Sequence, residues 1–300
     1  MKKITFLLLT IIILLSGKIH AQPFVDVVSF NYQTFSSTYT TNNNWKNKTD
    51  NYFLNFFLPK AFKNGNTLLI RLNTENIHSG FLTSPAYSYE LSSVSLPLGF
   101  KFVTSTKKWE TIVIGIPKIA CDFRDKVDEH DIQYGGIFLQ HFVPSDKLKI
   151  KLGLYYNREA FGDFWMPLVG VDWKVSERFN MYGVLPSNYR MEYAVVKNKL
   201  YAGLNFKSLT RSFRLSKNQD YDYVRYNEMQ LKLFLDCFVY KKILMYAELG
   251  YSLGENPIQF NYNTKTETNQ NPVYTPLKNY PLFNIGIAYR IRLDIEKKDQ

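Results

Sequence analysis

The chain has 300 residues, of which 45% are hydrophobic and 16% aromatic, and its formal net charge is +11. The positive charge does not indicate nucleic-acid binding, because the lysines lie in expected turns and at alternate strand positions and no nucleic-acid motif is present. After the N-terminal apolar stretch, no segment reaches the roughly 18 apolar residues of a membrane-spanning helix. The composition therefore excludes nucleic-acid-binding proteins and helical membrane proteins.

The N-terminus is predicted to be a secretory signal peptide, residues 1–21. It has a charged start at Lys2-Lys3, an apolar stretch from Ile4 to Leu15 and a small residue at Ala21, where we expect cleavage. No cysteine lies near that position, which argues against a lipid anchor. The remaining residues, 22–300, are predicted to form one domain.

The rest of the chain repeats a unit of about 20 residues in which apolar and polar side chains alternate, a spacing typical of β-strands. In the last unit Ile285 and Ile287 fall on one face, and Arg290 and Arg292 fall on the other. A chain made of such strands can close on itself and turn its apolar face to lipid. The pattern predicts an all-β fold, a single antiparallel transmembrane β-barrel; a soluble β-sandwich with core aromatics is the alternative.

About 14 strands are expected, with 12 as the alternative because the ninth and tenth are short. In chain order the strands are predicted at Phe24–Phe35, Tyr52–Leu58, Thr67–Glu75, Tyr89–Val103, Lys108–Ile119, Ile132–Phe142, around Leu148–Leu154, Phe164–Val175, Phe179–Leu185, Tyr189–Val196, Leu200–Leu209, Tyr221–Tyr240, Ile243–Leu253 and Leu282–Ile295.

The connections between these strands are mostly long and short in alternation. With both termini in the periplasm, the short turns fall on the periplasmic side and the longer loops outside, as in outer-membrane barrels. The expected outer loops include Ser36–Asp50, His78–Ser88, Cys121–Asp131, Asn157–Asp163 and Glu255–Tyr280. The bacterial outer membrane is therefore the predicted location.

The final strand carries a pattern of polar, glycine, aromatic and hydrophobic residues at Asn284, Gly286, Tyr289 and Ile291. It resembles the β-signal of outer-membrane barrel proteins, although Glu296–Gln300 follow it. The resemblance implies recognition by the barrel-assembly machinery.

A second resemblance covers the middle third of the chain, Pro167–Phe206. It depends on Gly170-Val171-Asp172-Trp173-Lys174, then Gly183-Val184-Leu185-Pro186, then Tyr201-Ala202-Gly203. This stretch resembles a family of uncharacterised outer-membrane β-barrel proteins common in Bacteroidota. The family has no assigned activity, so the resemblance implies the fold and transfers no functional residue.

Charged side chains on the expected inner face are the candidate functional residues. Those predicted to line the lumen are Lys147, Lys149, Lys151, Arg190, Glu192, Lys232, Asp236, Glu248, Arg290 and Arg292. The same face includes Arg71, Glu75, Lys101, Asp172, Lys174 and Asp294. Both signs are present, which fits either ion pairs that fill a narrow interior or a weakly selective channel, and the lysine row could steer anionic solutes.

No catalytic, cofactor or metal site is predicted. The loop Asp122–Asp131 contains five carboxylates but lacks the spacing and glycine of a calcium loop. His78 and Ser79 lie in an expected outer loop, at the right depth for a catalytic pair, but adjacent residues on a strand point to opposite faces, so the two cannot easily form one. Cys121 and Cys237 are expected to be free thiols.

The favoured function is a passive channel or transporter for small or amphipathic solutes, without enzymatic activity. The alternative is a structural or surface-interaction barrel with a filled lumen, whose outer loops bind a partner; an outer-membrane lipid hydrolase ranks third. Expected partners are outer-membrane lipid, lipopolysaccharide and the assembly machinery. The sequence fixes neither the solute nor the oligomeric state, nor whether the lumen is open.

Overall fold

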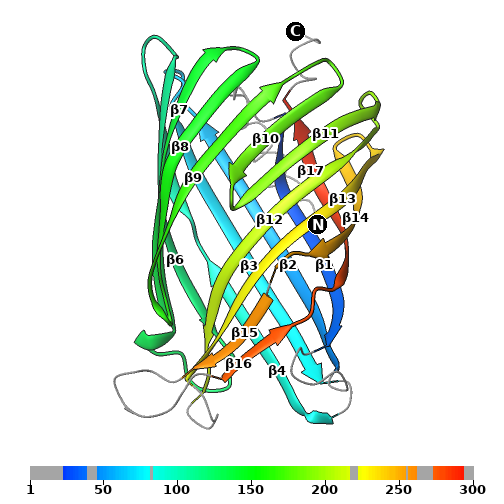
Figure 1. The fold of residues 1–300 in the computed structure, drawn as a ribbon. Coiled ribbons are helices and arrows are strands. Elements are labelled where there is room, and N and C mark those ends of the chain that lie inside the picture. Colours follow the sequence, from blue (N-terminus) through cyan, green and yellow to red (C-terminus); the bar gives the residue numbers. More distant parts are fainter. Residues whose placement is uncertain are drawn as a thin grey trace, which may run out of the picture.

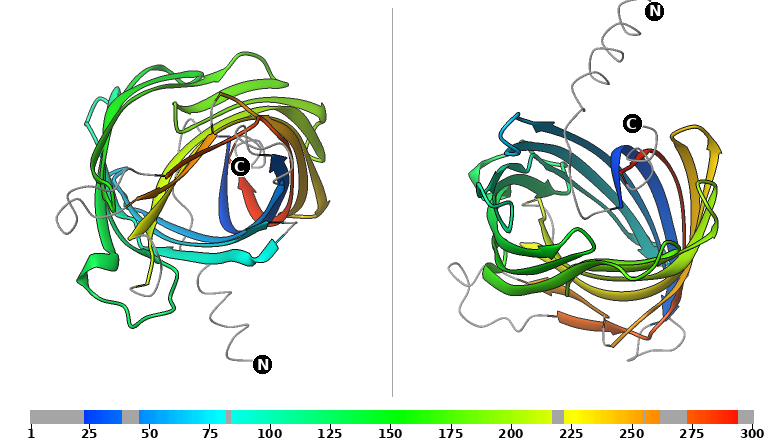
Figure 2. Two further views of the ribbon diagram at one scale, coloured as in Figure 1. Left: turned by 60° about the horizontal axis from the view of Figure 1, so that its bottom comes forward. Right: turned by 90° about the horizontal axis from the view of Figure 1, so that it is seen from above.

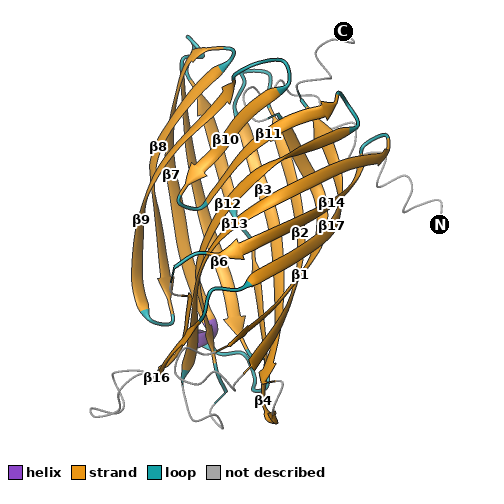
Figure 3. Cartoon of the chain, turned by 45° about the vertical axis from the view of Figure 1, so that its right-hand side comes forward, coloured by secondary structure: helices purple, strands orange, loops and turns teal. Residues whose placement is uncertain are grey.

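The computed structural model describes residues 23–38, 46–81, 84–216, 222–254, 256–261 and 273–293, which form an antiparallel β-barrel (Figure 1). The one short helical element among them is the turn η1, Glu129–Asp131 (Figure 3). No helix in this part of the chain is long and apolar enough to cross a membrane. The predicted signal peptide and Asp294 lie outside the described residues.

The strand segments are β1 (Phe24–Thr38), β2 (Lys46–Ala61), β3 (Thr67–Phe81), β4 (Ser84–Ser95), β5 (Leu98–Val103), β6 (Trp109–Cys121), β7 (Ile132–Ser145), β8 (Leu148–Glu159), β9 (Gly162–Lys174), β10 (Phe179–Leu185), β11 (Asn188–Val196), β12 (Leu200–Arg214), β13 (Tyr223–Tyr240), β14 (Ile243–Ser252), β15 (Asn256–Asn261), β16 (Val273–Leu277) and β17 (Pro281–Arg292). These 17 segments form 14 barrel strands, because β4 with β5, β14 with β15, and β16 with β17 are each one interrupted strand. The 14-strand prediction is confirmed. The 12-strand alternative is wrong, since β10 and β11 both take part in the barrel ladder.

The barrel closes between its first and last strands. β1 pairs with β2 on one side and with β17 on the other, where the register runs from Phe24 opposite Arg292 to Phe35 opposite Leu282. The start of β1 and the end of β17 therefore lie at one end of the barrel, where the strands are joined by the short turns 62–66, 104–108, 146–147, 175–178, 197–199 and 241–242. We call this the periplasmic end and the opposite one the outer end (Figure 2).

Apolar side chains cover the outside of the barrel. On β8 Leu152 is 64% exposed and on β9 Val169 is 55% exposed, and Trp165 and Trp173 lie toward the two ends of the same band. Many charged side chains are buried inside. A soluble protein shows the reverse distribution, so the outer surface is one that lipid covers, and the soluble-sandwich alternative is wrong.

Four predicted loops are wrong in whole or in part. Ser36–Asp50 overlaps the end of β1 and the start of β2, and Glu255–Tyr280 contains β15 and β16. β3 continues to Phe81, so His78–Ser88 is mostly strand, and the connection between β8 and β9 is only the turn 160–161. The strands extend past the apolar band with polar side chains that still pair: inside the barrel, Ser79 contacts Thr49 at 2.8 Å and donates to Asn47. His78 is exposed and Ser79 buried, on opposite faces of β3.

Candidate functional site

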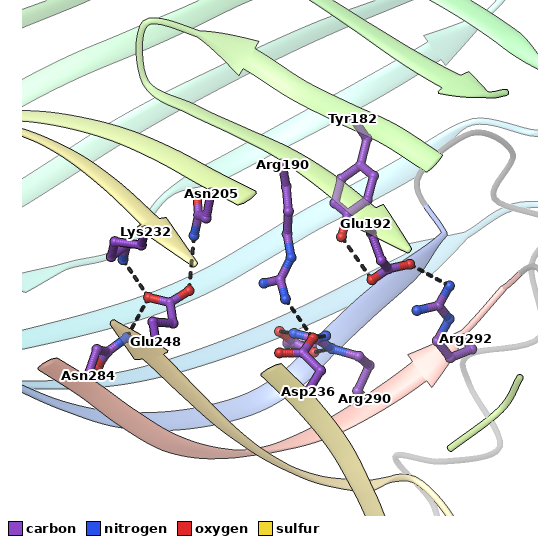
Figure 4. Close-up of polar contacts among 11 residues, drawn as sticks. Tyr182, Arg190, Glu192, Asn205, Lys232, Asp236, Glu248, Asn284, Arg290 and Arg292 are labelled. Atoms are coloured by element: carbon purple, nitrogen blue, oxygen red, sulfur yellow. Dashed lines mark hydrogen bonds and ion pairs between the residues drawn. The ribbon is translucent and has the colours of Figure 1, made fainter. Parts of the chain in front are cut away.

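A network of ion pairs fills one side of the lumen, between β10–β14, β17 and β1 (Figure 4). At its centre the buried Asp236 accepts hydrogen bonds from Arg190 Nη2, at 2.6 Å, and from Arg290. Arg290 also donates to both carboxylate oxygens of Asp26, at 2.5 and 2.8 Å. The Arg290 guanidinium lies 3.5 Å from the centre of the Phe24 ring, which covers it.

The same network continues on both sides of Asp236. Glu192 accepts a hydrogen bond from Arg292 Nη2 at 2.8 Å and another from the Tyr182 hydroxyl at 3.2 Å. Glu248 is 2.5 Å from the ammonium group of Lys232 and also accepts from two asparagine side chains. All three acids are at most 4% exposed. On this side, the predicted lumen-facing charges are therefore paired with one another.

A second charged cluster lies near the periplasmic end of β5–β9. Glu110 is contacted by Lys149 at 2.6 Å, by His141 Nδ1 at 3.1 Å and by Lys101 at 3.8 Å. Lys151 contacts Asp172 at 2.5 Å. The expected lysine row is therefore not an unpaired positive stripe.

Lys147 and Lys174 do not line the lumen. Lys147 is exposed in the turn 146–147, because β8 begins only at Leu148, and Lys174 is exposed at the end of β9. The expectation for these two residues is wrong, since the alternation of faces holds only within a strand.

Between the two charged regions the inner face is apolar. A cavity of about 430 Å³, which we call the chamber, has as its main apolar lining Val25, Phe57, Leu69, Ile112, Ile114, Ile116, Ile137, Leu139 and Val184. The chamber was not predicted. A signal was present at Ile112–Ile116, Leu68–Ile70 and Ile137–Leu139, where the chain is apolar on both faces of the strand.

Arg71 projects into the lumen beside the chamber. Its guanidinium lies 4.6 Å from the centre of the Phe57 ring, and the side chain is exposed within the barrel. None of the ion pairs between described residues includes Arg71. It therefore offers a cation beside an apolar cavity.

Apolar side chains close the outer end of the lumen. We call this cluster the outer plug; it consists of Phe35, Ile77, Leu91, Ala120, Phe213, Leu215, Val224, Tyr226, Ile258, Leu277, Tyr280 and Leu282. The rings of Phe35 and Tyr280 stack with centroids 4.1 Å apart. Arg214 at the end of β12 pairs in parallel with Cys121 at the end of β6, and Asp122 N donates to Arg214 O at 3.0 Å, so the ends of these two strands meet.

The predicted assembly residues lie on β17. Asn284 donates to Glu248 at 2.8 Å. A Cβ atom on Gly286 would overlap the ring of Tyr246 and lie 2.6 Å from the backbone oxygen of Phe30, so the ring and the neighbouring strand occupy the space a side chain would need. Tyr289 is half-buried, and Ile291 is 8% exposed against 43% for Ile285. Their role in assembly stays a prediction.

The acidic loop Asp122–Asp131 contains the short helical turn η1, whose backbone N–H groups are capped by its carboxylates. The carboxylate of Asp128 accepts from His130 N at 2.8 Å, and Asp131 accepts from Asp128 N at 2.8 Å. Among the described residues no group of three or more His, Cys, Asp or Glu side chains could hold a metal ion. Cys121 and Cys237 are free.

Comparisons with known proteins find no match among curated proteins. Among solved structures, an outer membrane channel from Pseudomonas putida F1 has 11% identity and a TM-score of 0.48, covering 92% of this chain and 98% of that one. The translocator domain of the autotransporter NalP from Neisseria meningitidis has 10% identity and a TM-score of 0.39, covering 96% of each chain. A mutant of the monoaromatic hydrocarbon channel TodX has 8% identity and a TM-score of 0.45, covering 89% and 91%.

At these values none of the three structures informs the function of this chain. The family model of a domain of unknown function, DUF6268, matches residues 83–290, which is more than half of the chain. The chain therefore belongs to the DUF6268 family, in agreement with the resemblance to an uncharacterised barrel family.

Proposed function

We propose that this protein is a bacterial outer-membrane barrel that passively admits small amphipathic molecules. The chamber carries the proposal. Its volume of about 430 Å³ lies within the range of small-molecule pockets, roughly 300–1,000 Å³. Its lining combines the apolar side chains named above with Arg71 and with the charged side chains of the second cluster, Lys101, Glu110, His141, Lys149, Lys151 and Asp172. Such a cavity favours molecules that combine an apolar body with a polar group.

The outer plug argues against a general water-filled pore. An ion that entered along the barrel axis would have to pass side chains such as Ile77, Leu91 and Phe213, which are 0% exposed. Moving an unpaired charge through an apolar region is strongly unfavourable. Small hydrophilic solutes are therefore not the expected cargo.

The alternative of a structural barrel with a filled lumen is favoured by one observation, the network around Asp236. That network fills only one side of the lumen, and the chamber between β2, β3, β6 and β7 is not filled by side chains. Because the cavity beside these ion pairs is left open, we infer that the interior binds a ligand and is not merely filled for stability.

Uptake by cells tests the proposal. An intact outer membrane slows the entry of N-phenyl-1-naphthylamine, an uncharged apolar probe that fluoresces in lipid. Cells that express the protein should take it up faster than cells with an empty vector, and Ile114→Trp should remove the gain because Ile114 lines the chamber. Val113→Trp is the matched control, since Val113 is the next residue on β6 and faces outward with 47% exposure.

Two results would contradict the proposal. One is uptake equal to that of the empty-vector cells. The other is the appearance of steady, large conductance steps when the refolded protein is added to a planar bilayer. Such steps would indicate a water-filled pore, and the outer plug would then not close the lumen in the membrane.

A further inference from the structure

The barrel wall is interrupted between β9 and β12. The hairpin of β10 and β11 ends at residues 186–187, well short of the outer ends of its neighbours (Figure 1). β9 pairs with β10 only from Val169 to Lys174, and β12 pairs with β11 only from Leu200 to Lys207. The outer parts of β9 and β12 thus face each other, and no described strand lies between them.

The interruption is bounded by named strand segments on its two sides and by a hydrogen bond at its periplasmic side. Its sides are Gly162–Leu168 of β9 and Ser208–Ser212 of β12, which span about 20 Å and about 13 Å along the strands at roughly 3.3 Å per residue. At the periplasmic side, Ser208 N donates to Ser187 O at 3.0 Å. We call the framed opening the portal.

The outer side of the portal is closed at Ser212. The backbone N–H of Ala160 donates to Ser212 Oγ at 2.9 Å, and both the N–H and the hydroxyl of Ser212 donate to Glu159, at 2.8 and 2.7 Å. Gln133 Nε2 adds a bond to Ser212 O at 3.1 Å. Four contacts at a fully buried serine show that the wall is rejoined beyond the portal, so the opening is a built feature and not a frayed end.

The portal lies within the surface that faces lipid. Trp165 and Pro167, on the outer face of the same stretch of β9, are exposed on the apolar exterior. Strand edges with unpaired backbone groups do not occur against hydrocarbon; they are tolerated where they line a water-filled cavity or are covered by protein. No described strand covers the portal, so its polar edge calls for water or a ligand.

A cavity of about 570 Å³ leads inward from the portal. One side of its entrance is apolar, with Phe164, Met166 and Leu168 of β9, and the other carries the hydroxyls of Ser208 and Thr210 of β12. Its inner wall includes Arg71, Ile137, Leu139 and Val184, which also line the chamber. The cavity behind the portal and the chamber thus adjoin at Arg71.

We propose that the portal is a lateral passage for amphipathic carboxylates, molecules with an apolar chain and a single anionic head, between the chamber and the outer leaflet of the membrane. The chain would lie along the apolar β9 side, and the carboxylate would pair with Arg71. Among the described residues the Arg71 guanidinium forms no ion pair within 4.0 Å, and the nearby charge that acts on it is that of Asp26, which lines the same cavity. This inference rests on the proposed function, because it supplies the ligand class and the entry route for the same chamber.

Binding to the refolded protein tests the ligand class. Fluorescence titration with 11-(dansylamino)undecanoic acid and with its neutral amide separates the anionic head from the apolar chain. Arg71→Gln should weaken binding of the acid about tenfold, the effect of a lost charge-assisted hydrogen bond, and leave the amide unchanged. Arg71→Lys should restore most of the affinity for the acid. Equal effects on acid and amide would overturn the role of Arg71.

Bridging the portal tests the route. In a Cys121→Ser, Cys237→Ser background, Met166→Cys with Thr210→Cys places thiols on its two sides, and a bis-methanethiosulfonate spans them reversibly. Bridging should stop uptake of the dansyl acid by cells, and a reductant should restore it. The control pair is Ile150→Cys with Val171→Cys, which are paired neighbours on the continuous wall, and its bridging should change nothing.

The outcomes separate the two proposals. If bridging the portal leaves uptake of the dansyl acid unchanged, the lateral route is overturned. The proposed function is decided separately, by whether Ile114→Trp removes the gain in N-phenyl-1-naphthylamine uptake. If the double-cysteine chain fails to assemble, Thr210→Trp, which narrows the same opening from β12, should lower acid uptake, and full uptake by that variant would equally overturn the route.

Discussion

Neutralising Asp236 should destabilise the barrel more than any isosteric change at an exposed acid. The Asp236 side chain is 1% exposed and accepts two guanidinium groups. In Asp236→Asn, Arg290 keeps its contacts with Asp26, but Arg190 loses its carboxylate and is left buried between aromatic rings. Breaking a buried ion pair costs about 3–5 kcal/mol. Because one of the two arginines keeps a partner, we expect about 3 kcal/mol, the lower end of that range.

The measurement is unfolding of the refolded protein in lipid by guanidinium, followed by tryptophan fluorescence. Glu177→Gln is the matched control, because Glu177 contacts Lys197 at 2.6 Å on the surface, with side-chain exposures of 71% and 48%. An exposed pair contributes little, so this variant should unfold with the wild type.

A double variant isolates the cause. In Arg190→Leu with Asp236→Asn no unpaired guanidinium remains buried, so the double variant should be more stable than Asp236→Asn alone. Equal stability of Asp236→Asn and Glu177→Gln, or a double variant that is less stable than the single one, would refute the electrostatic reasoning.

Three further predictions concern the exterior, the last strand and the N-terminus. Leu152→Arg places a cation in the middle of the apolar band and should cost about 2–4 kcal/mol, whereas Leu148→Arg beside the turn should cost far less; equal costs in the same unfolding assay would count against a lipid-facing surface. Gly286→Val should lower the yield of folded barrel, seen as the heat-sensitive band on gels, because Tyr246 occupies the space, and a normal yield would mean that the ring can move. Mass spectrometry of the protein from outer membranes should find Gln22 as the first residue, and an unprocessed N-terminus would contradict the predicted cleavage.

The number of strands and their inner and outer faces were predictable because side chains alternate with a period of two. The range of β10, Phe179–Leu185, agrees with the prediction. The outer ends of the strands were not predictable. There the strand is polar on both faces, with Asn47 and Thr49 on the inner face and Lys46 and Lys48 on the outer one. Such a segment resembles a loop, although backbone pairing extends the sheet well past the apolar band.

The candidate site was predictable only in its composition. The sequence indicates that charges of both signs face inward, but the partners lie far apart along the chain: Glu192 and Arg292 are 100 positions apart. Their pairing depends on barrel closure and tilt, which alternation does not specify. The portal depends on the short lengths of β10 and β11, a feature visible in the sequence whose meaning appears only when their neighbours are seen to be longer.

The last strand also completes the charge balance of the interior. Asp26 and Glu192 receive their cations from Arg290 and Arg292, both on β17, and Asn284 of the same strand contacts Glu248. A chain that stopped before β17 would leave two inward carboxylates without a cation and would leave the edge of β1 unpaired. Closure of the seam and neutralisation of these two carboxylates therefore both depend on β17.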